Sequence, residues 1–67
     1  MKGDNTLGMN PEYTIGDYEV ESTDDGTLAV VRYLPTGKPM MRFTGDTALL
    51  DARRYAQDMH VAMRGTF

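Results

Sequence analysis

The residues that could form a hydrolytic or metal centre are few and poorly spaced. A serine nucleophile requires a base and a third group that orients the base. The chain has one serine, Ser22, in a strand-like segment and one histidine, His60, late in a helical segment. Asp58 and His60 lie two residues apart, so on a helix their side chains diverge by about 200° and do not suit a shared metal ion. Because cysteine is absent, disulfides and thiolate metal sites are excluded.

Two glycine-containing turns resemble ligand loops only in part. A phosphate loop requires a glycine five residues before its Gly-Lys pair and Ser or Thr after it, where Gly37-Lys38 has Arg32 and Pro39. Asp24-Asp25-Gly26 lacks the spaced ligands and the later glutamate of a calcium loop. Paired carboxylates can hydrolyse glycosides, but a chain this short leaves little room for a cleft. We therefore expect no enzyme activity, no cofactor, no metal and no small-molecule substrate.

Length and charge limit the classes of partner. Sixty-seven residues form one domain at most, and a chain of this size often gains stability from a partner. Residues 1–27 carry seven carboxylates and one lysine, whereas residues 28–67 carry six basic side chains and three carboxylates. A pI of about 4.8 disfavours direct nucleic-acid binding. No apolar run has the length of a signal peptide core or a membrane span, so we expect a cytoplasmic chain without membrane contact.

The elements that must position these residues follow a lead-in segment. Residues 1–12 are rich in turn formers, and we expect them to be flexible. Apolar and polar residues alternate over residues 13–23, which predicts a half-buried strand. The sequence Asp24-Asp25-Gly26 predicts a turn. A second strand is expected over residues 27–34, and a short third strand over residues 40–44.

A helix is expected from Thr47 to Arg64. Asp46 is the predicted N-cap, because its carboxylate can accept free amides of the first turn. An apolar stripe recurs at helical spacing through Leu49, Ala52, Ala56, Met59 and Met63. The fold class is therefore α+β: a three-stranded antiparallel sheet, in the order strand, strand, strand, helix, with one C-terminal helix on one face. Residues 13–67 form the single domain.

One helix covers one face of such a sheet, so the alternation predicts which side chains are covered and which are open. The covered face is expected to carry Tyr18, Val20, Ala29, Val31, Tyr33, Met41 and Phe43. The open face is expected to carry Glu19, Glu21, Leu28, Val30, Arg32, Leu34, Met40 and Arg42. Apolar residues rimmed by charge mark an association site. In the alternative, the glutamates pair with the arginines across strands and the N-terminal segment covers the apolar residues. A register slip of one residue would exchange the faces.

Small size, acidity and the lack of a catalytic set predict a non-enzymatic protein-binding module. Such chains are typical of inhibitors or decoys carried by phages, including anti-CRISPR and other anti-defence proteins. The acidic stretch over residues 17–25 could imitate a phosphate backbone and occupy a basic groove on a larger protein partner. The predicted partner-binding residues are Asp17, Glu19, Glu21, Asp24, Asp25, Leu28, Val30, Arg32, Leu34, Met40 and Arg42.

Two other functions stay open. The first is a homodimeric structural or adaptor protein that pairs through the open face or the edge of the third strand. The second is a DNA-binding domain: Arg32-Tyr33-Leu34-Pro35-Thr36-Gly37-Lys38, continued by Arg42-Phe43-Thr44, resembles the hairpin of integrase arm-type DNA-binding domains. That resemblance implies a three-stranded sheet that reads the major groove, with affinity that falls steeply with salt and depends on Arg32 and Arg42.

Overall fold

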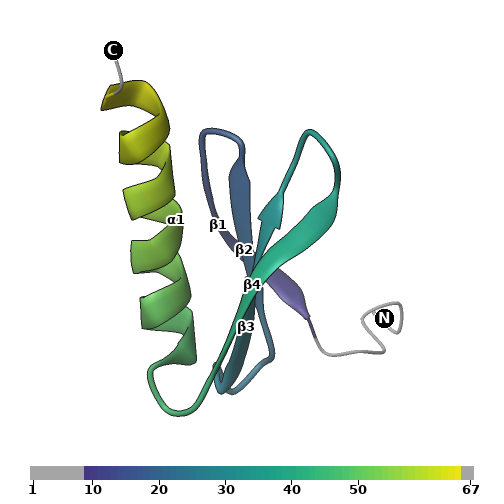
Figure 1. Cartoon of the computed structure of the whole chain (residues 1–67). Helices are drawn as coiled ribbons and strands as arrows, with labels where there is room; N and C mark the ends of the chain where they lie inside the picture. The colour runs from purple at the N-terminus through teal and green to yellow at the C-terminus, as the bar shows by residue number, and fades with distance from the viewer. Residues whose placement is uncertain (1–8, 66–67) are drawn as a thin grey trace.

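The computed structural model describes residues 9–65, which fold into an antiparallel sheet and one helix. The sheet has the strand order β1-β2-β3-β4, so every strand pairs with its neighbour in sequence. The helix follows the last strand and lies along one side of the sheet (Figure 1). The elements are β1 (Asn10–Ile15), β2 (Tyr18–Ser22), β3 (Leu28–Tyr33), β4 (Lys38–Thr44) and α1 (Ala48–Gly65).

The sheet has four strands, and the prediction of three is wrong. The segment expected as one strand over residues 13–23 folds back at Gly16 and Asp17, so that Ile15 pairs with Tyr18. Gly16 has φ of 57°, which a two-residue hairpin turn demands and which glycine adopts without steric cost. Strand β1 also begins earlier than expected, because Asn10–Glu12 of the predicted lead-in belong to it. Residues 1–8 of that lead-in lie outside the described residues.

The core lies between the sheet and α1. Three alanines at four-residue spacing, Ala48, Ala52 and Ala56, are fully buried and let the helix approach the sheet closely. Two aromatic contacts border this core, with ring centroids 5.5 Å apart for Tyr18–Tyr33 and 5.7 Å apart for Phe43–Tyr55. The predicted covered face is confirmed for the buried residues Tyr18, Val20, Ala29 and Val31 and for the partly buried Tyr33 and Phe43.

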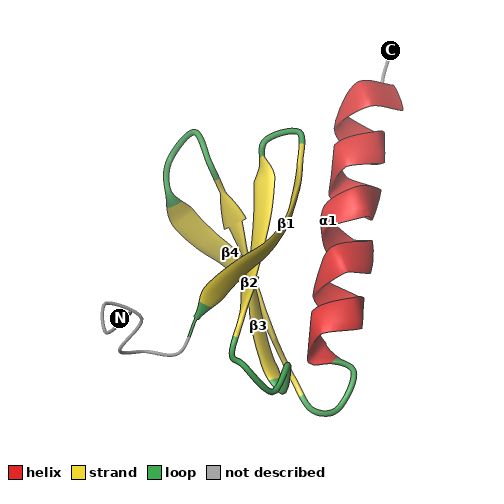
Figure 2. Cartoon of the chain, turned by 180° about the vertical axis from the view of Figure 1, so that it is seen from behind, coloured by secondary structure: helices red, strands yellow, loops and turns green. Residues whose placement is uncertain are grey.

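Met41 departs from that covered face. It pairs with the buried Val31, yet 45% of its surface is exposed. The cause is the twist of the sheet, since the β3–β4 hairpin leans away from α1 (Figures 1 and 2). The helix therefore covers the end of β4 that contains Phe43 and leaves the other end open.

The helix begins one residue later than expected. Thr47, rather than Asp46, directly precedes the first helical residue, and its carbonyl accepts the amide hydrogen of Asp51 at 2.8 Å. The Thr47 hydroxyl also donates to Asp51 Oδ2 at 3.0 Å. The first turn thus closes on itself through a side chain, as helix starts commonly do.

Candidate interaction site

The face of the sheet opposite α1 is aligned in rows across β2, β3 and β4. One row contains Glu21, Val30 and Arg42, because Val30 pairs with both neighbours. Since side chains alternate along a strand, Leu28 and Arg32 share this face with Val30. The one-residue slip that would have exchanged the faces is absent from the central pairing, so the residues of β2 and β3 assigned to the open face do lie on one side of the sheet.

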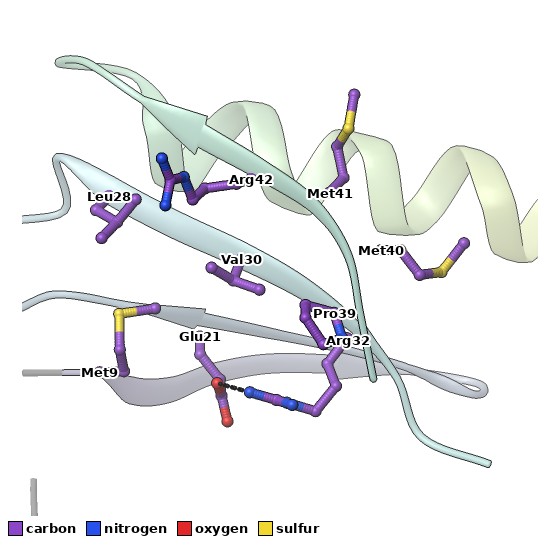
Figure 3. A pocket seen from close by; sticks show the side chains of 9 residues that line it. All are labelled: Met9, Glu21, Leu28, Val30, Arg32, Pro39, Met40, Met41 and Arg42. Atoms are coloured by element: carbon purple, nitrogen blue, oxygen red, sulfur yellow. Dashed lines mark hydrogen bonds and ion pairs between the residues drawn. The ribbon is translucent and has the colours of Figure 1, made fainter. Parts of the chain in front are cut away.

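A shallow hollow of about 560 Å³ lies on this face. Its floor is the side chains of β3, and one wall is formed by β4 (Figure 3). Leu28 and Val30 are only half-buried, although they occupy the middle of a sheet. The lining residues are Met9, Glu21, Leu28, Val30, Arg32, Pro39, Met40, Met41 and Arg42.

One ion pair joins two residues that line the hollow. Arg32 Nη2 lies 3.1 Å from Glu21 Oε1, and Arg32 Nη1 donates to the carbonyl of Gly37 at 2.6 Å (Figure 3). The pair is diagonal, because the register places Arg32 opposite Glu19. The two side chains are 32% and 21% exposed, so the pair contributes at most about 1 kcal/mol to stability.

The other two charges of this face lack such a pair. Among residues 9–65, Arg32–Glu21 is the one ion pair shorter than 4 Å, which leaves Glu19 and Arg42 without one inside the described part of the chain. Glu19 belongs to β2 and Arg42 to β4, on opposite sides of the central strand β3. The alternative in which the glutamates pair with the arginines across strands therefore holds for one pair only.

The remaining acidic residues of the predicted site lie elsewhere. Asp24 and Asp25 sit in the turn between β2 and β3, and Asp24 Oδ1 accepts a hydrogen bond from the side-chain amide of Asn10 at 2.7 Å. Asp25 Oδ1 accepts from the Thr27 amide at 3.1 Å and from the Thr23 and Thr27 hydroxyls, both at 2.8 Å. These bonds, that from the Thr27 amide foremost, hold the pKa of Asp25 below its ordinary value. Asp25 thus closes the turn on itself, whereas Asp24 ties the turn to β1.

Six of the predicted partner-binding residues meet at the hollow: Glu21, Leu28, Val30, Arg32, Met40 and Arg42. Glu19 shares the face without lining the hollow, Asp17 lies in the β1–β2 turn, and Leu34 begins the β3–β4 turn. Met9, Pro39 and Met41 line the hollow and were not in the predicted set. Met9 could have been found as the apolar residue next to β1, whereas Pro39 and Met41 depend on a register shift in β4 that no local pattern announces.

The serine and the histidine considered for catalysis make structural contacts. Ser22 is buried, and its hydroxyl donates to the carbonyl of Thr23 at 3.1 Å. His60 is half-buried against Gly16 in the β1–β2 turn. Within residues 9–65 no three His, Asp or Glu side chains are grouped so as to hold a metal ion. The one described helix is not apolar enough to cross a bilayer.

Comparisons with protein-family models, with curated proteins and with solved structures found no significant match.

Proposed function

We propose that this chain is a non-enzymatic protein-binding module that docks on a partner protein through the open face of its sheet. The observation that carries the proposal is the hollow opposite α1, where apolar side chains form the floor and charges of both signs form the rim. An apolar centre with a charged rim is the usual anatomy of a protein interface. A patch of this kind gains no burial free energy in the isolated domain, and a partner that covers it removes that apolar surface from water.

The finer proposal is that the partner is larger and that binding blocks it, as inhibitors and decoys of the phage anti-defence or anti-CRISPR type do. Its support is the acidic character of the chain, which has a net charge of −3. Glu19 and Glu21 are the acidic residues on the open face, and Glu21 is already paired with Arg32. Mimicry of a phosphate backbone would rest on these two, because Asp24 and Asp25 are engaged in the β2–β3 turn.

The DNA-binding alternative has weaker support. Its basis was a three-stranded sheet, and the chain has four strands. Arg32 is neutralised by Glu21, and Glu19 lies on the same face. A phosphate backbone that approached this face would meet both carboxylates.

The proposal is tested by affinity capture from host-cell lysate, with and without nuclease, followed by identification of the retained proteins. The decisive variant is Val30→Asp, which places a charge on the floor of the hollow. Val61→Asp is the matched control, because it makes the same change on α1 at a residue that is 63% exposed. We expect one stoichiometric protein that resists nuclease, is lost with Val30→Asp and is retained with Val61→Asp. Equal capture by both variants, or capture that disappears with nuclease, would contradict the proposal.

A further inference from the structure

We infer that a second copy of this chain occupies the open face when no other partner is present, and that the two copies pack face to face about a two-fold axis running along β3. The inference rests on the proposed function, because it assigns an occupant to the same face. The order of charges across the sheet supports it. The prolines and register shifts of the two edge strands support it as well, because they disfavour pairing at the edges.

The charges of the open face are complementary to themselves. The row Glu21, Val30, Arg42 places an acid on β2, an apolar residue on β3 and a base on β4. A half-turn about an axis along β3 brings β2 of one copy over β4 of the other. Glu21 of each copy then faces Arg42 of the other copy, and the two Val30 side chains face each other. Such reciprocal contacts are those of an isologous dimer.

The other in-plane axis is disfavoured by the same row. An axis perpendicular to the strands would bring β2 over β2, so that Glu21 meets Glu21 and Arg42 meets Arg42. Like charges brought together at an interface oppose association. Arg32 does approach its equivalent in the favoured arrangement, but Glu21 and the Gly37 carbonyl already engage its guanidinium.

Apolar residues dominate the line of the axis. Leu28 and Val30 both lie on β3, and both are half-buried within one copy. Contact with a second copy would complete their burial and remove this apolar surface from water. Met9 and Met40 flank them and line the same hollow. Methionine adapts its shape to an imperfectly matched surface, which suits a contact between two identical faces.

The edges of the sheet do not offer a second copy an equally good site. The edge strands are β1 and β4, and each contains a proline together with a shift in register. Pro11 and Pro39 cannot donate a ladder hydrogen bond, and a shifted register bends a strand away from a straight partner. Lys38 and Arg42 add positive charge to β4. Natural sheets use these devices to prevent edge-to-edge pairing.

The size of the face predicts a weak dimer. Four strands spaced about 4.8 Å apart and about 20 Å long present roughly 400 Å², which is small beside the ~800 Å² that each partner of a standard interface buries. We therefore expect a dissociation constant in the micromolar range, with association that weakens as salt screens the Glu21–Arg42 contacts.

The experiment is sedimentation equilibrium of the full chain over roughly 1 μM to 1 mM, a range that brackets micromolar affinity. The wild type should rise from the 7.5 kDa monomer to twice that mass. Arg42→Glu should weaken association at least about tenfold, because it sets a carboxylate against Glu21 of the second copy. Val30→Asp should give a monomer and Val61→Asp a wild-type dimer. Circular dichroism establishes that each variant is folded.

A monomer mass at every concentration would overturn the inference, as would a dimer that Val30→Asp or Arg42→Glu leaves intact. Failure of this inference is distinguishable from failure of the proposed function. A chain that stays monomeric but captures a protein in a Val30-dependent manner retains the proposed function and loses the second copy as occupant. A dimer that depends on Val30 in a chain that captures no other protein supports the second copy and contradicts the blocking of a larger partner.

Discussion

The imidazole of His60, near the C-terminal end of α1, lies directly against the backbone of Gly16 in the β1–β2 turn. A Cβ atom built on Gly16 would lie 2.7 Å from Cε1 of His60 and closer still to Nδ1, inside van der Waals contact. Gly16 also has φ of 57°, a conformation that L-residues seldom adopt. One small residue thus serves two purposes, since it closes the β1–β2 hairpin and lets the helix pass next to it.

Gly16→Ala should therefore destabilise the fold by more than the roughly 1–2 kcal/mol expected from the left-handed backbone alone. The measurement is urea unfolding followed by circular dichroism. Gly37→Ala is the matched control, because Gly37 has φ of 73° and no atom within 4 Å of the added methyl group. In a His60→Ala background, the cost of Gly16→Ala should fall to that of Gly37→Ala. An equal cost in both backgrounds would show that His60 does not contact the turn in solution.

The same turn explains why the sequence predicted one strand where the chain forms two. Tyr13 and Ile15 are odd-numbered, whereas Tyr18 and Val20 are even-numbered, so a continuous strand would place the first pair on the face opposite the second. The hairpin pairs Ile15 with Tyr18 and Tyr13 with Val20, which brings all four to the core face. The apolar positions change from odd-numbered to even-numbered across Gly16 and Asp17, and this change was the available signal for a turn. The regular alternation of residues 18–21, taken alone, does not reveal it.

The face assignment of the central strands could be predicted because their pairing is regular. Alternation along β2 and β3 separates Val20 and Val31 from Glu21 and Val30, and the register keeps these sets apart. The limits of the site depend on longer-range geometry. Met41 has the sequence pattern of a covered residue, but the lean of the β3–β4 hairpin exposes it.

The acidic stretch shows a different limit of sequence reasoning. Glu21 and Asp25 are both carboxylates in a run of acidic residues, and nothing in their type separates a residue on the open face from one that closes a turn. The hydrogen bonds from Thr23 and Thr27 to Asp25 make that distinction, and they require the folded turn. Charge counting therefore overestimates the number of acidic residues available to a partner.

The alanine stripe of α1 should be intolerant of larger side chains. Ala52 is fully buried against the sheet, so Ala52→Leu must displace the helix or force strained rotamers, at a cost of about 1–3 kcal/mol. Ala62→Leu is the control, because Ala62 lies on the exposed last turns of the same helix and the change there should be nearly neutral. Urea midpoints measure both variants. If Ala52→Leu proved as stable as Ala62→Leu, close contact between the helix and the sheet would be excluded.

Acid should weaken the fold through the β2–β3 turn. The hydrogen bonds that Asp25 accepts from the Thr27 amide, the Thr23 hydroxyl and the Thr27 hydroxyl lower its pKa below the ordinary value of 3.8. Because the folded pKa lies below the unfolded one, this carboxylate stabilises the fold above pH 3.8, and its contribution is lost as pH falls from there through the folded pKa.

The check is the unfolding midpoint measured between pH 2 and pH 6. Asp25→Asn should lower stability near neutral pH and flatten the decline toward acid, because the amide neither titrates nor accepts hydrogen bonds as a charged group does. Asp58→Asn removes one carboxylate from the exposed surface of α1 and controls for the change in net charge. A decline toward acid that is as steep in Asp25→Asn as in Asp58→Asn would mean that the turn does not hold the Asp25 carboxylate in solution.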